Sequence, residues 1–154
     1  MDTDKIICEL SDQYDFYKRD LPLFMLANRM SGNKKFYAKL LHIKKTVVGF
    51  YTCRKIKQSM TIDFIFIIPE YRRKGYTSNI INQLKSKYDE VYINGIENDI
   101  MRKLATKLGF IYKNKCKDNV GDLYYWNKII SSSSSSFSSS SSSLQNNSQR
   151  LQMD

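Results

Sequence analysis

Several classes of protein need residues that this sequence has little of. Its three cysteines, Cys8, Cys53 and Cys116, lie far apart and form no CxxC pair, which argues against a disulfide framework and a zinc site. His42 is the only histidine, so a multi-histidine metal centre is excluded and no metal ligand is predicted. No apolar run approaches the roughly 18 residues that span a bilayer, and the acidic start MDTDK does not resemble a signal peptide. These absences predict a cytoplasmic protein with no membrane partner.

Acidic residues are also scarce, and the formal net charge is +10. From Ser131 to Ser143 every residue but Phe137 is serine, and a Gln/Asn-rich end follows, so residues 131–154 are predicted to be a disordered tail behind a single domain of residues 1–130. The tail charges cancel, so the excess lies on the domain and favours polyanions such as nucleic acid or a phosphorylated cofactor. A compositional bias toward lysine explains the charge equally well. With no zinc finger or aromatic-interleaved basic motif, nucleic acid is an unlikely partner.

The N-terminal half is predicted to contain one short strand, two helical segments and three longer strands. Residues 5–10 (KIICEL) are the short strand, and helical turns follow around Asp12 to Arg19 and again from Pro22 to Met30. The β-branched and aromatic runs 36–43, 46–56 and 60–68, with short polar turns between them, predict an antiparallel meander. Its third strand is apolar on both faces from Phe64 to Ile68 and should therefore be central.

The C-terminal half is predicted to add two helices and three strands. One helix has its apolar face at Ile80, Ile81, Leu84 and Tyr88, and Val91–Ile93 is a strand. Asn98 caps a helix with Ile100, Met101, Leu104 and Leu108 on its buried face, Gly109 ends it, and Phe110–Lys115 and Leu123–Ile129 form a hairpin. The predicted class is α/β (α+β): a mixed, mostly antiparallel sheet of six or seven strands with helices on both faces.

The most informative segment is IFIIPEYRRKGYTSNII, residues 65–81. A strand, a glycine-centred basic turn and a helix start aim backbone N–H groups and the positive end of a helix dipole at one point, which suits a phosphate. The cradle is predicted over residues Arg72 to Thr77. The alternative is an ordinary basic connection in which Gly75 relieves backbone strain.

The order of elements and two motifs resemble the GNAT N-acetyltransferase superfamily over residues 5–129. The first motif is the apolar strand, Pro69 and Arg72-Arg73-Lys74-Gly75-Tyr76-Thr77, which follows the family pattern Arg/Gln-x-x-Gly-x-Gly/Ala except at Thr77. The second is the helix of Asn98 and Leu108-Gly109-Phe110. In this helix Met101 replaces an alanine, and Ala105 stands where the family often has a tyrosine that protonates the departing thiolate.

The resemblance implies acetyl-CoA as acyl donor and assigns residues to it. The amides of Arg72, Arg73, Lys74, Gly75, Tyr76 and Thr77 would bind the pyrophosphate, and Arg73 and Lys74 add positive charge. Main-chain groups of Ile65, Phe66 and Ile67 would pair with the pantetheine arm in the gap beside the strand at Val91. The Asn98 side chain would reach the thiol-end half, cap its helix, or do both.

Catalytic groups are less defined. Asp63 is a carboxylate within an apolar strand, where burial suits a general base, although an ion pair with a lysine is the alternative. Glu97 is the second candidate for the base. Because Ala105 cannot donate a proton, the acid is another group, water, or absent together with catalysis. Candidate acids are Tyr112, Tyr124 and Tyr125, and strand alternation lets only one of the last two face the cleft.

The predicted function is therefore an acetyl-CoA-dependent N-acetyltransferase acting on a primary amine of a small molecule or a protein. A non-catalytic acyl-CoA-binding protein and a basic nucleic-acid-binding module are the alternatives. The sequence identifies neither the acceptor nor the oligomeric state.

Overall fold

The computed structural model describes residues 2–14, 32, 35–116 and 121–132. The elements in chain order are α1 (Thr3–Gln13), β1 (Phe36–Ile43), β2 (Thr46–Ile56), β3 (Ser59–Ile67), η2 (Pro69–Tyr71), α3 (Tyr76–Lys87), β4 (Glu90–Ile96), α4 (Asp99–Lys107), β5 (Ile111–Lys115) and β6 (Asp122–Asn127). Residues 128–132 are helical, and the rest of the predicted tail lies outside the described residues.

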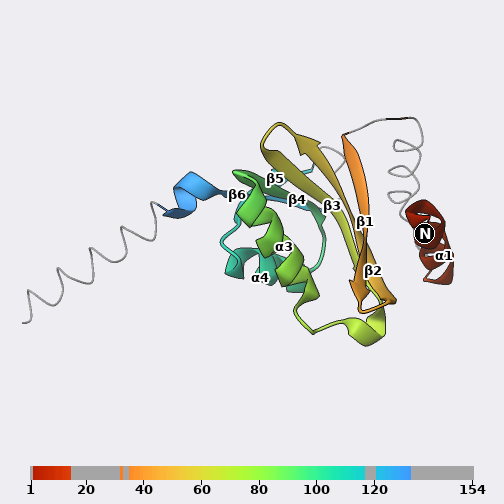
Figure 1. Ribbon diagram of the computed structural model, residues 1–154. Helices are drawn as coiled ribbons and strands as arrows, with labels where there is room; N and C mark the ends of the chain where they lie inside the picture. The colour runs from red at the N-terminus through yellow and green to blue at the C-terminus, as the bar shows by residue number, and fades with distance from the viewer. Residues whose placement is uncertain (1, 15–31, 33–34, 117–120, 133–154) are drawn as a thin grey trace, which may run out of the picture.

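The strands form one sheet in the order β1-β2-β3-β4-β6-β5. Only β3 and β4 are parallel, and the other neighbours are antiparallel. Helices α3 and α4 cover one face and α1 lies on the other (Figure 1). The predicted class, the three-strand meander and the central position of β3 are confirmed.

Two apolar clusters hold the layers together. The larger one packs Ile80, Ile81 and Leu84 of α3 against the sheet, where Ile62 and Val91 are almost fully buried. The smaller one packs Ile7 and Leu10 of α1 on Phe50 and Phe66. Burial of one such side chain is worth about 1.5–3 kcal/mol, so both faces of β3 are fixed by packing.

The predicted strand 5–10 is wrong, because these residues lie in α1. Asp2 caps the helix by accepting from the Asp4 amide at 3.1 Å, and Ile7 and Leu10, three residues apart, are buried on one face. A short apolar run does not distinguish helix from strand by periodicity. The described sheet therefore has six strands. Of the predicted helical turns of 12–19, residues 12 and 13 belong to α1 and residues 15–19 lie outside the described residues, as does the predicted helix 22–30.

Two further predictions need correction. Ile100, expected on the buried face of α4, is 78% exposed, while Ala105 is fully buried. Ile100 sits at the edge of the apolar stripe, a quarter turn from its centre. Ile129, expected in the last strand, is helical, because the Asn127 side chain accepts from the amides of Ile129 and Ile130 at 2.8 and 3.3 Å and starts a new helix.

The predicted helix ends at Asn98 and Gly109 are confirmed. Asn98 Oδ1 accepts from the Met101 amide at 2.8 Å, and Gly109 has φ +86°. Within the described part of the chain, no helix has the length and apolar character needed to cross a membrane.

Candidate active site

The central strands β3 and β4 separate halfway along their length. They pair only from Ser59 to Ile62 against Glu90 to Ile93, although β3 continues to Ile67 and β4 to Ile96. Each strand has a β-bulge at this point. In β3 the unpaired residue is Asp63, and in β4 the pairing with β6 jumps from Ile93 to Ile96. Bulges bend strands and redirect side chains, and they are frequent beside active sites.

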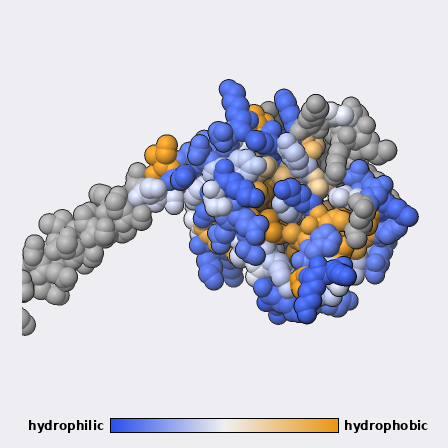
Figure 2. Space-filling view, in the orientation of Figure 1, coloured by the Kyte–Doolittle hydropathy of each residue, from blue (hydrophilic) through white to orange (hydrophobic). Residues whose placement is uncertain are grey.

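The separation opens a cleft of about 870 Å³ between β3, β4, α3 and α4. This volume is within the range of about 300–1,000 Å³ for ligand sites. Figure 2 shows apolar side chains, in orange, in the middle of this side of the molecule, framed by hydrophilic ones. Among the predicted site residues, all but Lys74 line the cleft: Asp63, Ile65, Phe66, Ile67, Arg72, Arg73, Gly75, Tyr76, Thr77 and Asn98. The Lys74 ammonium instead lies 5.4 Å from the centre of the Tyr71 ring.

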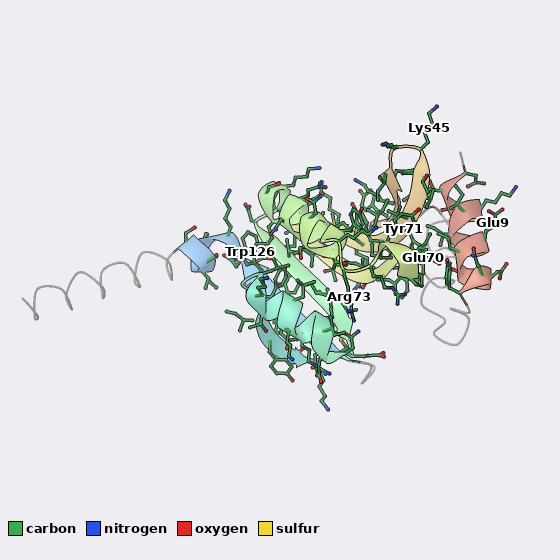
Figure 3. All side chains as sticks on the ribbon, turned by 90° about the horizontal axis from the view of Figure 1, so that it is seen from below. Glu9, Lys45, Glu70, Tyr71, Arg73 and Trp126 are labelled. Carbon is green, nitrogen blue, oxygen red and sulfur yellow. The ribbon has the colours of Figure 1, made fainter. Side chains whose placement is uncertain are left out.

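The turn between β3 and α3 has two left-handed residues, Arg73 with φ +61° and Gly75 with φ +79° (Figure 3, where Arg73 is labelled). Alternating backbone hands of this kind point successive N–H groups into one concavity that binds anions. Gly75 is also the N-cap of α3, and its carbonyl accepts the first helical bond, from Asn79 at 3.0 Å. The amides of Tyr76, Thr77 and Ser78 therefore precede the helical ladder. A Cβ added at Gly75 would meet no atom within 4 Å and would project into open space.

Arg72 is used differently from the prediction. Its amide donates to the Pro69 carbonyl at 3.2 Å, so it is not a free donor of the cradle. Its Nε donates to the Ile67 carbonyl at 2.9 Å, and its guanidinium lies 5.7 Å from the centre of the Phe66 ring. Arg72 thus fastens the turn to β3 and occupies one of the main-chain groups assigned to the pantetheine arm.

Asp63 is buried, as predicted, with its side chain 3% exposed. Its partner is an arginine rather than a lysine. Arg54 Nε and Nη2 donate to the two carboxylate oxygens at 2.7 Å each, and Asn94 Nδ2 donates at 3.2 Å. Three donors hold the carboxylate in place and leave one of its roughly four lone-pair sites to accept a proton.

The same network continues to the edge of the sheet. The Cys116 thiol donates to Asn94 Oδ1 at 2.8 Å, and the Gly95 amide donates to Cys116 Sγ at 3.3 Å. Asn94 lines the cleft and was not predicted. The dipeptide Asn94-Gly95 inside an apolar strand was the available signal, because such a pair marks a bulge.

None of the three candidate acids lines the cleft. Tyr112 and Tyr124 stack edge to face with ring centres 5.9 Å apart, and the Tyr125 hydroxyl donates to Glu90 at 3.1 Å. Two other tyrosines, Tyr71 and Tyr76, do line it, as does Glu97.

A sheet split beside a basic turn with two left-handed residues is the arrangement expected from the resemblance to acetyltransferases that take their acyl group from acetyl-CoA. The model of the Acetyltransferase (GNAT) family matches residues 4–110, so the chain belongs to this family. GNAT enzymes use acetyl-CoA as acyl donor, as the resemblance implied. No curated protein matches the chain.

Solved structures agree on the fold. An acetyltransferase from Exiguobacterium sp. 255-15 is 17% identical with a TM-score of 0.59, covering 81% of this chain and 87% of that one. A GNAT-family acetyltransferase from Staphylococcus aureus is 16% identical with a TM-score of 0.58 (80% and 92%). The PaiA N-acetyltransferase of Thermoplasma acidophilum, solved with coenzyme A, is 16% identical with a TM-score of 0.53 (82% and 80%).

Proposed function

We propose that the protein transfers the acetyl group of acetyl-CoA to a primary amine. The observation that carries the proposal is the split between β3 and β4, which opens beside the turn with two left-handed residues. In a GNAT-family chain, this cleft supports the assignment of a diphosphate, an extended arm and an acceptor to it.

The turn fits the diphosphate. Amides at the start of α3 and the helix dipole favour an anion, and open space lies over Gly75. We assign the pyrophosphate to the amides of residues 73–78, with the Arg73 side chain adding charge. This range replaces the Arg72 amide, which is already bonded.

The free edge of β3 fits the pantetheine arm. Beyond Ile62 this edge has no pairing with β4, so an extended chain can add to it as a strand would. We assign the arm to the main chain of Ile65 and Phe66. Asn98, whose Oδ1 caps α4, still has its Nδ2 group for the arm.

When bound, acetyl-CoA supplies an activated acyl carbon, and the chain supplies position and proton transfer. The strands on both sides of the split would hold the acceptor nitrogen next to that carbon. Such positioning reduces the entropy cost of bringing the two reactants together. We keep Asp63 as the candidate base, acting through a water molecule, and Glu97 as the second candidate. Both residues line the cleft.

The test is calorimetric titration of the full chain with acetyl-CoA, followed by detection of released thiol with an amine panel. Gly75→Trp should abolish binding, because the new side chain enters the space above the amides. Gly32→Trp is the matched control: Gly32 also has positive φ and open space around its Cβ, but it does not line the cleft. No binding by the unmodified chain, or equal binding by both variants, contradicts the proposal.

A second candidate function is acyl-CoA binding without transfer. It is favoured by Ala105, which is fully buried and stands where the family often has a tyrosine that protonates the departing thiolate. Acetyl-CoA binding with no released thiol across primary amines would support it.

A further inference from the structure

The sheet face opposite α3 and α4 presents polar and aromatic side chains next to the cleft. Along β4, Val91 and Ile93 are buried in the larger apolar cluster. The alternate residues Glu90, Tyr92 and Asn94 therefore point to the other face. Asn94 shares Asp63 with Arg54, and Arg54 lies on this other face because its strand neighbour Cys53 is buried in the larger cluster.

Two tyrosine rings lie together on this face. Tyr92 of β4 is directly opposite Tyr125 of β6, and their ring centres are 4.9 Å apart. Both side chains are half-buried. Two adjacent π-faces attract a cation more strongly than one.

The chain places one of its own ammonium groups on this pair. Lys113 Nζ lies 5.1 Å from the centre of the Tyr92 ring and 5.4 Å from that of Tyr125. Lys113 is the unpaired residue of a β-bulge, between the pairs Tyr112↔Tyr124 and Asn114↔Leu123. The bulge aims an exposed lysine of an edge strand at the ring pair.

A carboxylate accompanies the rings. Glu90 Oε2 accepts from the Ser59 hydroxyl at 2.6 Å, and Oε1 accepts from the Tyr125 hydroxyl at 3.1 Å and from Asn127 Nδ2 at 3.4 Å. The bond from Ser59 is the main reason that the pKa of Glu90 lies below its ordinary value, and the charge of Lys113 lowers it further. The ring pair and the anion together have the composition of an ammonium-binding site.

This site lies on the same strand as Asn94, which lines the cleft and contacts Asp63. Tyr92 precedes Asn94 by two residues, which is about 7 Å along a strand. That is close to the distance between the nitrogens of extended 1,4-diaminobutane. One nitrogen at the split would leave the other over the tyrosines.

We infer that Tyr92, Tyr125 and Glu90 form a subsite for the second ammonium group of a diamine acceptor, which displaces the Lys113 ammonium. The inference rests on the proposed function and narrows its acceptor to an aliphatic dication. Exchange of one ammonium for another leaves the charge of the subsite unchanged. An exposed cation–π contact is weak enough to exchange.

The first experiment compares acetylation of 1,4-diaminobutane with that of n-butylamine by the full chain. The diamine should be preferred, and Tyr92→Leu should lower the ratio of the two kcat/KM values about tenfold. Tyr92→Phe keeps the ring and should keep the ratio. Lys113→Met should lower the KM for the diamine, because the internal competitor is gone. Tyr37→Leu, an exposed strand tyrosine at the other end of the sheet, is the matched control.

The second experiment needs no turnover. The full chain is titrated with 1,4-diaminobutane and with n-butylamine at matched ionic strength. Saturable binding of the diamine that Tyr92→Leu weakens and Lys113→Met tightens supports the subsite, and binding that is insensitive to both substitutions overturns it.

The two proposals fail separately. Acetylation of both amines with no preference for the diamine overturns the subsite and leaves the acetyltransferase intact. If acetyl-CoA binds but neither amine nor any of the panel is acetylated, the transferase proposal fails, and the titration alone decides whether the subsite binds a dication.

Discussion

The two sides of the cleft present different chemical groups. The turn at Arg73 and Gly75 presents main-chain amides, and its shape depends on two left-handed residues. The side at Asp63 and Asn94 presents side chains, which are held by one another and by Arg54 of β2 and Cys116, the residue after β5. A backbone site is changed by a substitution that alters the fold of the turn. A side-chain site is changed by the loss of any one partner.

The largest effect expected is on the side-chain network. Asp63→Ala should lower the free energy of unfolding by about 3 kcal/mol, because it leaves the Arg54 guanidinium without its bidentate partner among buried groups. Arg54 is 35% exposed, which keeps the loss at the lower end of the range for buried pairs. Urea denaturation measures it.

A double substitution is the control for this prediction. Asp63→Leu with Arg54→Met removes both charges, and it should cost less than Asp63→Ala alone. Equal costs would show that the cavity, and not the unpaired charge, causes the loss.

Asn98 belongs to both kinds of site, because its side chain caps α4 and we also assign its Nδ2 group to the pantetheine arm. Asn98→Ala should lower the free energy of unfolding by about 1 kcal/mol, because the Met101 amide loses its cap. Asn98→Asp keeps the acceptor oxygen and should keep stability, while it removes the Nδ2 donor that we assign to the pantetheine arm. Acetyl-CoA affinity should therefore fall in both variants. Full affinity in Asn98→Asp would confine Asn98 to capping.

The backbone site is tested by a substitution that is expected to stabilise the fold. Arg73 has φ +61°, a conformation that costs about 1 kcal/mol or more for a residue with a Cβ. Arg73→Gly should remove that strain and raise the free energy of unfolding by about 0.5 kcal/mol after the entropy of the unfolded chain is counted. Lys74→Gly, next to it and without positive φ, should be destabilising in the same thermal or urea measurement. Destabilisation by both would mean that the turn is not strained.

The same contrast explains what the sequence could predict. The turn is local: a strand, Pro69, Gly75 and a helix start follow one another within residues 65–81, so the motif is visible in one segment. The helix caps at Asn98 and Gly109 are equally local. The network is not, because Asn94 meets Asp63 and Cys116 at separations of 31 and 22 positions.

Bulges hide the remaining site residues from sequence patterns. Asp63 and Lys113 are each the unpaired residue of a bulge, so strict alternation does not give the side to which they point. The sequence also named Tyr112, Tyr124 and Tyr125 as candidate acids, but it did not show that Tyr112 contacts Tyr124, that Tyr125 bonds to Glu90, or that none of the three lines the cleft. The prediction of a strand at residues 5–10 was wrong for a different reason, because this segment is too short for periodicity to distinguish a helix from a strand.

A small, pH-dependent effect is expected at Glu90. Its folded pKa is below the ordinary value of 4.5, chiefly because the Ser59 hydroxyl bonds to the ionised form. A depressed carboxyl pKa contributes stability above the unfolded pKa, and this contribution is lost as pH falls through the folded value. Glu90→Gln should therefore be less stable than the unmodified chain near about pH 7, by under about 1 kcal/mol because the group is only partly buried.

The difference between the two proteins should shrink steadily as pH falls from 4.5 and vanish once Glu90 is protonated in the folded state. Urea unfolding of both proteins across that interval measures the difference. At each pH the free energy of unfolding of the unmodified chain is compared with that of Glu90→Gln, so that the contributions of the other carboxyl groups cancel. A difference that stays constant with pH would mean that the pKa of Glu90 is the same in the folded and the unfolded chain. Glu90 would still be ionised at neutral pH, but the bond from Ser59 would add nothing to the stability of its charged form, and the electrostatic contrast between a backbone site for phosphate and a side-chain site for amine would lose this support.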